Sequence, residues 1–348
     1  MKLINLMLTA ALVAPIIALG FWCSTALAGE NLSGQPAVQS GWLTSMEDAK
    51  NIARKEGKDI LVDFTGTDWC VWCIKLDEEV FSTKAWAAGG AKQFVMLQLD
   101  FPRNKELAKG QKEHNQKLKE EFEVQGFPTI FLLDADGAPY AKTGYQPGGP
   151  VKYLEHLNGL SRQKDEKNAL ARQIAEAPAK DKPALLNQLI GKLNEWEIGF
   201  WYPGFKEEAV NLDEDNKQGF RLKYALELVY YYHGKQNKPK QDYYFEIVKK
   251  LSPAKTGEIE LDFKIEEIQS KYYGKKDWKG ALVEFESLAK ADYKGEAGQK
   301  LYYQIALAHN GLKDQKQARE NLQKARDFAP DSELGREIKQ ILEKMKVK

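Results

Sequence analysis

The sequence has few cysteines and no excess of charge of either sign. Among its 348 residues are three cysteines and four histidines, and 51 Lys and Arg residues balance 50 Asp and Glu residues. Three cysteines are too few for a disulfide-stapled scaffold, and a net charge of +1 argues against a strongly basic nucleic-acid-binding protein. Hydrophobic residues make up 43% of the chain, so substantial cores can form, and the length suggests two domains or a modest array of repeats.

The N-terminal segment contains one of these cysteines. Lys2 is followed by an apolar run from Leu3 to Trp22, and an Ala-Leu-Ala sequence ends at Ala28. We expect residues 1–28 to be a signal peptide that is cleaved after Ala28 and removes Cys23. An uncleaved membrane anchor is the alternative, because the apolar run approaches the ~20 residues that span a bilayer. The predicted location is periplasmic or extracytoplasmic, with a membrane tether as the alternative.

Residues 42–162 alternate between helical and strand patterns, after a linker over residues 29–41 that is rich in Gly, Ser, Gln and Pro. Short apolar runs predict four strands, over residues 60–64, 94–99, 128–133 and 139–143. Helices are expected after Ser45, after Cys70 and from Pro150, and the charged segment 102–123 is expected to be partly helical. This order predicts an α/β sandwich in which helices flank a mixed sheet.

Residues 163–348 show no strand pattern and contain a repeat of about 34 residues. The clearest unit covers residues 299–332, with Ala318 and Ala325 where paired helices would approach, and two weaker units precede it. These columns resemble the tetratricopeptide repeat, which implies a helical repeat domain that binds a protein partner. Residues 333–348 are expected to form a polar capping helix, and the aromatic segment 196–205 is expected to lie in a core or domain junction.

Two cysteines remain, in the sequence Trp69-Cys70-Val71-Trp72-Cys73. A structural disulfide would close too small a loop to add much stability. A zinc site needs about four ligands, and the sequence has no second cysteine pair and only scattered histidines. The third use is a redox dithiol at a helix N-terminus, where the helix dipole favours a thiolate on the first sulfur. We favour the redox dithiol and expect neither a metal nor a cofactor.

The segments 60–64, 69–73 and 126–129 together resemble the thioredoxin family, over about residues 42–160. The resemblance implies that Cys70 is the exposed attacking thiolate. It also implies that Cys73 is the buried thiol that resolves the mixed disulfide.

The resemblance assigns roles to residues around this pair. Asp63 matches the buried carboxylate that exchanges protons with the resolving cysteine, while an ordinary strand-end carboxylate is the alternative. Pro128 matches the cis-proline whose loop binds the substrate chain, while a proline of an edge strand is the alternative. Phe127, Trp69 and Trp72 are the expected substrate contacts.

The sequence also departs from thioredoxin. Val71 and Trp72 stand where thioredoxin has Gly-Pro, and Asp63 lies seven residues before Cys70, one more than in thioredoxin. The Cys-Val-x-Cys form is similar to the periplasmic C-terminal domain of DsbD-type reductases. This similarity favours the reducing or isomerising direction and implies a membrane electron donor of DsbD type.

The sequence therefore predicts an exported thiol–disulfide oxidoreductase that acts on protein thiols or disulfides, with a helical repeat domain for partner binding. One alternative is a binding or assembly module whose thioredoxin-like domain is mainly structural. Another is a membrane-tethered redox partner in cytochrome maturation.

Overall fold

The computed structural model describes residues 41–345. The predicted signal peptide over residues 1–28 lies outside the described residues, as does nearly all of the predicted linker. Within residues 41–345, no helix combines the length and the apolar content that crossing a membrane requires.

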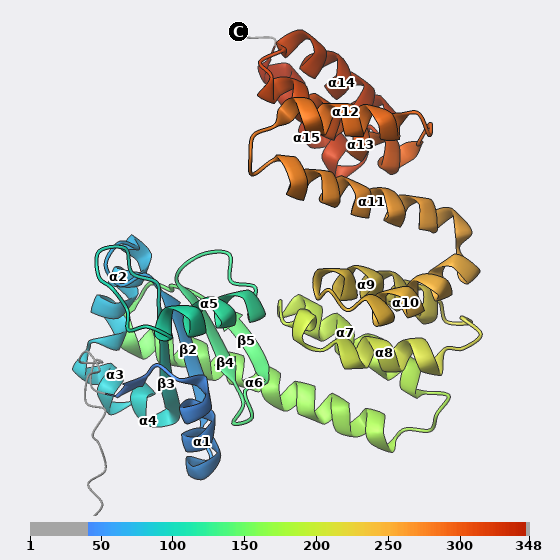
Figure 1. Cartoon of the computed structure of the whole chain (residues 1–348). Coiled ribbons are helices and arrows are strands. Elements are labelled where there is room, and N and C mark those ends of the chain that lie inside the picture. The colour runs from blue at the N-terminus through green and yellow to red at the C-terminus, as the bar shows by residue number, and fades with distance from the viewer. Residues whose placement is uncertain (1–40, 346–348) are drawn as a thin grey trace, which may run out of the picture. The chain divides into compact units, whose positions relative to one another are not determined.

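A five-stranded mixed sheet forms the first part of the described chain (Figure 1). The strands are β1 (Trp42–Leu43), β2 (Asp59–Thr65), β3 (Phe94–Asp100), β4 (Thr129–Leu133) and β5 (Pro139–Thr143). Their order is β1-β3-β2-β4-β5, in which β1, β3 and β2 run parallel and β4 is antiparallel to both β2 and β5. The four predicted strands and the mixed sheet are confirmed. Strand β1 was not predicted, because two residues are too few to show a pattern.

Helices cover both faces of this sheet. They are α1 (Met46–Glu56), α2 (Val71–Leu76), the π-helical turn η1 (Asp77–Phe81), α3 (Lys84–Ala88), α4 (Gly90–Gln93), α5 (Gln111–Glu121) and α6 (Gly149–Glu176). Because side chains alternate along a strand, Val62 and Phe64 enter the core formed with α1 and α5. The same alternation turns Asp63 toward the opposite face of the sheet. Tyr153 of α6 lies on that face. Burial raises the pKa of Tyr153, and the charge of Asp63 raises it further.

Local sequence signals set the ends of α1 and the turn between β4 and β5. The Oγ of Ser45 accepts a hydrogen bond from the backbone N–H of Asp48 at 3.2 Å, so Ser45 caps the start of α1 as predicted. Gly57 ends α1 at a φ of 64°, and Gly137 takes a φ of 88° in the turn before β5. Both values lie in the left-handed region that glycine adopts without steric cost.

Helix α6 is one continuous helix of 28 residues, and the predicted domain boundary at residue 162 falls inside it. Its second half is tied to the sheet by ion pairs from Lys164 to Asp59 at 2.6 Å and from Lys167 to Asp134 at 3.8 Å. The same half contributes Leu170 to the core of the helices that follow. The helix therefore contacts both the sheet and the core of the later helices, and the boundary itself stays a prediction.

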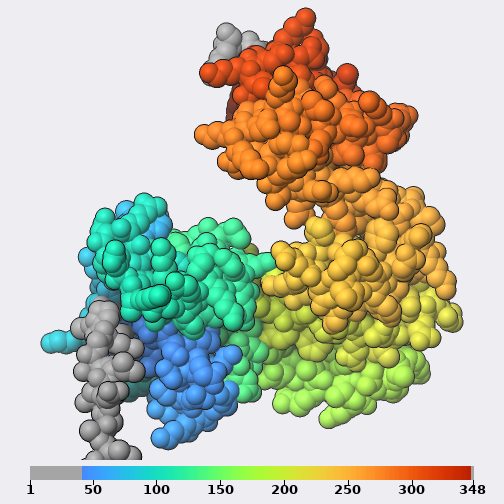
Figure 2. Space-filling model, viewed as in Figure 1, coloured from blue at the N-terminus to red at the C-terminus, as the bar shows by residue number. Residues whose placement is uncertain are grey.

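Helices make up the rest of the described chain (Figure 1). They are α7 (Lys182–Glu195), the 3-10 turn η2 (Gly199–Trp201), α8 (Pro203–Leu212), α9 (Phe220–Gly234), α10 (Lys238–Leu251), α11 (Pro253–Tyr272), α12 (Trp278–Ala289), α13 (Gly295–Gly311), α14 (Gln315–Phe328) and α15 (Glu333–Lys344). Figure 2 shows the side chains of α12 to α15, coloured orange to red, packed into a continuous mass. An α/β sandwich followed by an all-helical part is the fold that the sequence predicted.

A repeated turn joins the helices of three successive pairs, α9–α10, α11–α12 and α13–α14. In each turn a residue with positive φ precedes an N-cap residue, which is Asn237, Asp277 or Asp314. Each N-cap side chain accepts the backbone N–H three residues on, at 3.3, 2.9 and 3.0 Å. The caps lie 40 and 37 residues apart rather than the expected 34, because α11 and α13 are 20 and 17 residues long. The helix pairs are confirmed, and the tetratricopeptide assignment stays a prediction.

The aromatic segment near residue 200 packs between the two cores, as the sequence predicted. Trp201 stacks edge-on against Phe131 of β4 with centroids 5.1 Å apart, and its indole N–H donates to the carbonyl of Glu121 at 3.2 Å. The hydroxyl of Tyr202 donates to the carbonyl of Pro139 at 2.6 Å. These contacts join the start of α8 to the sheet.

Candidate active site

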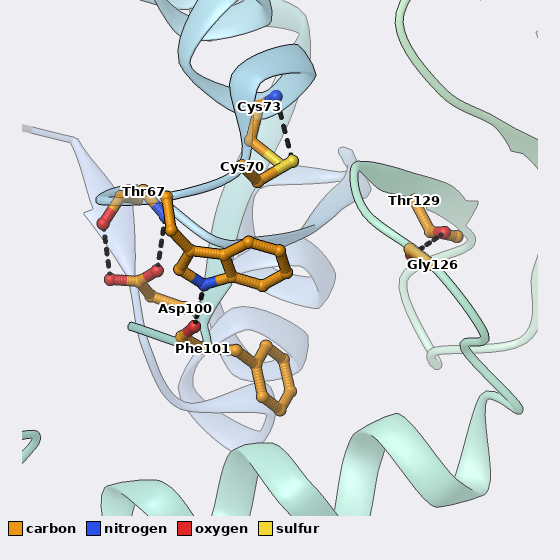
Figure 3. Close-up of a disulfide and its surroundings, with 8 residues drawn as sticks. Thr67, Cys70, Cys73, Asp100, Phe101, Gly126 and Thr129 are labelled. Carbon is orange, nitrogen blue, oxygen red and sulfur yellow. Dashed lines mark hydrogen bonds between the residues drawn. A yellow bond between two sulfur atoms is a disulfide. The ribbon is translucent and has the colours of Figure 1, made fainter. Parts of the chain in front are cut away.

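Cys70 and Cys73 form a disulfide at the N-terminus of α2, with their Cα atoms 5.2 Å apart (Figure 3). The backbone N–H of Cys73 donates to the Sγ of Cys70 at 3.2 Å, so Cys70 is the N-cap of this helix. In the reduced form the same N–H group and the positive end of the helix would favour a thiolate on Cys70. The location agrees with the predicted redox dithiol.

In the disulfide form Cys70 is buried, so the exposure predicted from the sequence is wrong for this form. Cys70 is 7% exposed and Cys73 3%, so both side chains are buried. The reason is the disulfide itself, which holds both sulfur atoms at the first turn of α2. The two residues between them face solvent instead, with Val71 72% and Trp72 54% exposed. The apolar surface beside the disulfide is therefore made by Val71 and Trp72.

A cluster that the sequence did not indicate holds Trp72 in place. The rings of Trp72 and Tyr145 lie 5.2 Å apart, and the Nζ of Lys75 lies 5.4 Å and 5.2 Å from their centroids. The hydroxyl of Tyr145 donates to the Oε2 of Glu79 at 2.7 Å. The hydrogen bond with Tyr145, and after it the charge of Glu79, raises the pKa of Lys75. Tyr145 follows β5, so only the tertiary fold brings it to α2.

The loop before Cys70 is fixed by the C-terminal end of β3. Asp100 accepts hydrogen bonds from the backbone N–H of Thr67 at 3.0 Å and from its hydroxyl at 2.8 Å (Figure 3). Lys105 forms an ion pair with the same carboxylate at 2.8 Å. Gly66 lies under the indole of Trp69, where a Cβ would come within 2.7 Å of the ring. The bonds between Asp100 and Thr67 join residues 33 positions apart, so the sequence did not indicate them.

The predicted substrate contacts Trp69 and Phe127 do lie together. Their rings meet edge to face with centroids 6.0 Å apart, and Phe101 stacks on Phe127 at 5.0 Å. The indole N–H of Trp69 donates to the carbonyl of Phe101 at 2.8 Å. The Phe127–Pro128 peptide bond is cis, as predicted. Trp72 belongs to the separate cluster around Tyr145, so the two tryptophans flank the disulfide with different neighbours.

Asp63 lies in the middle of the sheet, on the face opposite the α1–α5 core. The residue is 3% exposed, and its Oδ1 has no hydrogen-bond partner. Burial raises the pKa of Asp63 well above its ordinary value, and the charges of Asp77 and Asp100 raise it further. A carboxyl group in this environment can hold a proton and release it. Among residues 41–345, no group of three or more His, Cys, Asp or Glu side chains could hold a metal ion.

The disulfide lies at a helix N-terminus in a mixed α/β fold, and Trp69, next to Cys70, packs on the residue before a cis-proline. These features define the class of the thioredoxin-like dithiol proteins. A family model described as a thioredoxin-like domain matches residues 46–158. The disulfide bond reductase DsbH of Chlamydia pneumoniae is 32% identical over 131 residues, which cover 37% of this chain and 79% of that protein. The chain belongs to the thioredoxin-like family and is a thiol–disulfide oxidoreductase.

Two further similarities were found. The thioredoxin-related protein DsbJ of Chlamydia pneumoniae is 23% identical over 143 residues, covering 39% of this chain and 40% of that protein. A solved structure of a DsbH oxidoreductase is 31% identical and covers 38% of this chain and 94% of that chain, with a TM-score of 0.33. The family match ends at residue 158, before most of the helices.

Proposed function

We propose that the protein is an exported enzyme that reduces or isomerises disulfides of client proteins through Cys70 and Cys73. The Cys70 thiolate attacks a client disulfide, forms a mixed disulfide and releases one client thiolate. The Cys73 thiolate then attacks the Sγ of Cys70, releases the second client thiolate and leaves the Cys70–Cys73 disulfide. The client gains two electrons and the enzyme loses two. The observation that carries this proposal is the Cys70–Cys73 disulfide at the start of α2.

Asp63 is proposed as the group that accepts the proton of the Cys73 thiol. Its support is the burial of the carboxyl group and its raised pKa, on the face of the sheet that α6 covers. A base must bind a proton strongly enough to accept one near neutral pH, and a carboxyl group with an ordinary pKa binds it too weakly. The alternative from the sequence, an ordinary strand-end carboxylate, has less support because the side chain is buried rather than solvated.

The client chain is proposed to bind beside Pro128, against Phe127, Trp69 and Trp72. Support comes from the packing of Phe127 on Trp69 and from the exposure of Trp72. Exposed apolar side chains next to a reactive group mark a surface that meets a partner.

The reducing direction is supported by the similarity to a protein described as a disulfide bond reductase. Export is supported by the sequence of residues 1–28, and a membrane electron donor of DsbD type would then reduce the Cys70–Cys73 disulfide again.

The helical part is proposed to bind a protein partner, because its repeated turns build successive helix pairs, and stacked helix pairs commonly present surfaces that bind proteins. A Cys73→Ala variant would trap client proteins as mixed disulfides with Cys70. Identifying the trapped proteins tests whether the clients are exported and whether they also bind the helical part.

Insulin reduction in the presence of dithiothreitol tests the proposed chemistry. The wild-type protein should accelerate the reaction, and Cys70→Ser should abolish the acceleration because no mixed disulfide can form. Equal rates for the two proteins would overturn the proposal.

A further inference from the structure

Arg103 holds a free guanidinium group over the tryptophan that precedes Cys70. Its Cζ lies 3.7 Å from the centroid of the Trp69 ring. The residue is exposed, and among residues 41–345 no carboxylate forms an ion pair with it. Stacking on an aromatic face leaves the N–H groups at the edge of the guanidinium free to bind a planar anion.

Hydrogen bonds that involve backbone groups hold both Arg103 and Trp69 in place. The carboxylate of Asp68 accepts the backbone N–H of Arg103 at 2.9 Å and that of Asn104 at 2.5 Å. Desolvation works to raise the pKa of Asp68, but the N–H donors of Arg103 and Asn104 lower it overall, so the carboxylate stays ionised. The indole of Trp69 is fixed in turn by its hydrogen bond to the carbonyl of Phe101. The backbone of Arg103 and the indole of Trp69 are therefore both fixed before a client binds.

The stack is connected to both the disulfide and the cis-proline loop through Trp69. Trp69 is adjacent to Cys70 in the chain, and its ring also packs on that of Phe127, which precedes the cis-proline. A client chain bound at Phe127 and Pro128 would therefore pass close to the guanidinium of Arg103.

Arg103 is the cation of this region that stacks on Trp69, next to Cys70 in the chain. Lys105 is occupied by Asp100 at 2.8 Å. A cavity of about 410 Å³ borders Arg103, and its lining also includes Glu106 and Lys112. The cavity offers room for a side chain next to the guanidinium.

We propose that Arg103 is a specificity-determining residue that binds a carboxylate side chain of the client, close in sequence to the client's disulfide. This inference rests on the proposed reduction of client disulfides. An aspartate or glutamate would lie against the edge of the guanidinium and accept two N–H bonds from it, which is the geometry that arginine forms with carboxylates. The enzyme therefore prefers disulfides in acidic segments.

Two disulfide-bonded peptides that differ only in one residue next to a cysteine, Glu or Gln, test this proposal. The measurement is the ratio of kcat/KM for the two peptides at about 0.15 M ionic strength, where long-range charge effects are screened. For the wild-type protein this ratio should be about three to ten, the range expected of an exposed but charge-assisted contact. Arg103→Gln should bring the ratio to about one. Arg103→Lys should give an intermediate ratio, because an ammonium group lacks the planar fork.

Lys112→Gln is the matched control, because it removes the same charge from the same cavity without touching Trp69. It should keep the wild-type ratio. A ratio near one for the wild-type protein, or an equal loss in Lys112→Gln and Arg103→Gln, would overturn the inference while leaving the proposed function intact. Failure to reduce either peptide or insulin would overturn the proposed function, and the inference with it.

Discussion

At the scale of single residues, Asp63 stands out in the sheet as a buried carboxyl group with an unpaired oxygen. Its neighbours in the strand, residues 60–62 and 64, are apolar and buried, and one oxygen of Asp63 has no hydrogen-bond partner. Burying a carboxyl group in this way costs free energy, mostly when it is ionised. Such a cost is characteristic of a residue retained for chemistry rather than for stability.

Replacing Asp63 with Asn should slow the step in which Cys73 resolves the mixed disulfide. Because positioned acid–base groups typically contribute a hundredfold or more, we expect a loss of about a hundredfold in that step. Stopped-flow measurement of single-turnover insulin or peptide reduction gives the rate. Asp136→Asn, which changes an exposed carboxylate in the turn before β5, is the control and should keep the wild-type rate. Equal rates for both variants would argue against a role for Asp63 in proton transfer.

The same carboxyl group should make stability depend on pH. Its pKa is raised in the folded state from an ordinary value of 3.8, so between the two values the folded chain holds a proton that the unfolded chain has released. Stability should therefore fall as the pH rises from about 3.8 through the folded pKa, and then level off. Asp63→Asn should lack this fall and should gain stability relative to the wild-type protein at neutral pH. Urea unfolding at several pH values provides the measurement, and parallel curves for the two proteins would contradict the account.

At the scale of elements, the end of β3 organises the loop that carries Cys70. Asp100→Ala removes the acceptor for both the N–H and the hydroxyl of Thr67, and it leaves Lys105 without its ion pair. We expect a loss of about 2 kcal/mol in the free energy of unfolding, the range for hydrogen bonds to a charged group. Hydrogen exchange should also become faster at residues 66–69. Asp136→Ala should change stability by less than about 0.5 kcal/mol, because its ion pair is exposed. Equal effects of the two variants would contradict this role of Asp100.

The sequence predicted the elements well where the physical signal is local. Strands β2, β3 and β4 are short apolar runs, and Ser45 and Gly57 mark the ends of α1, so each could be read from neighbouring residues. Contacts between distant segments could not. The bond between Tyr145 and Glu79 joins residues 66 positions apart, and neither residue belongs to a recognisable motif.

At the scale of the whole described chain, α6 and Trp201 couple the sheet to the helices that follow. Trp201→Ala removes the ring that packs on Phe131, so we expect a loss of about 2–3 kcal/mol, somewhat below the cost of a fully buried tryptophan. Amide protection in β4 should fall. Trp196→Ala is the matched control, because Trp196 packs on the helical core and should leave β4 unchanged. Native-state hydrogen exchange measures both, and unchanged protection of β4 in Trp201→Ala would show that the junction does not couple the two cores.

The reduction potential of the Cys70–Cys73 pair tests the central claim most directly. An enzyme that exchanges disulfides with client proteins should have a potential between about −270 and about −120 mV, and a reductase should lie near the lower end of that range. Equilibration with glutathione or dithiothreitol buffers, followed by thiol counting, gives the value. We predict a potential within this range. A potential below about −300 mV, typical of structural disulfides, would contradict the account and favour a binding or assembly module.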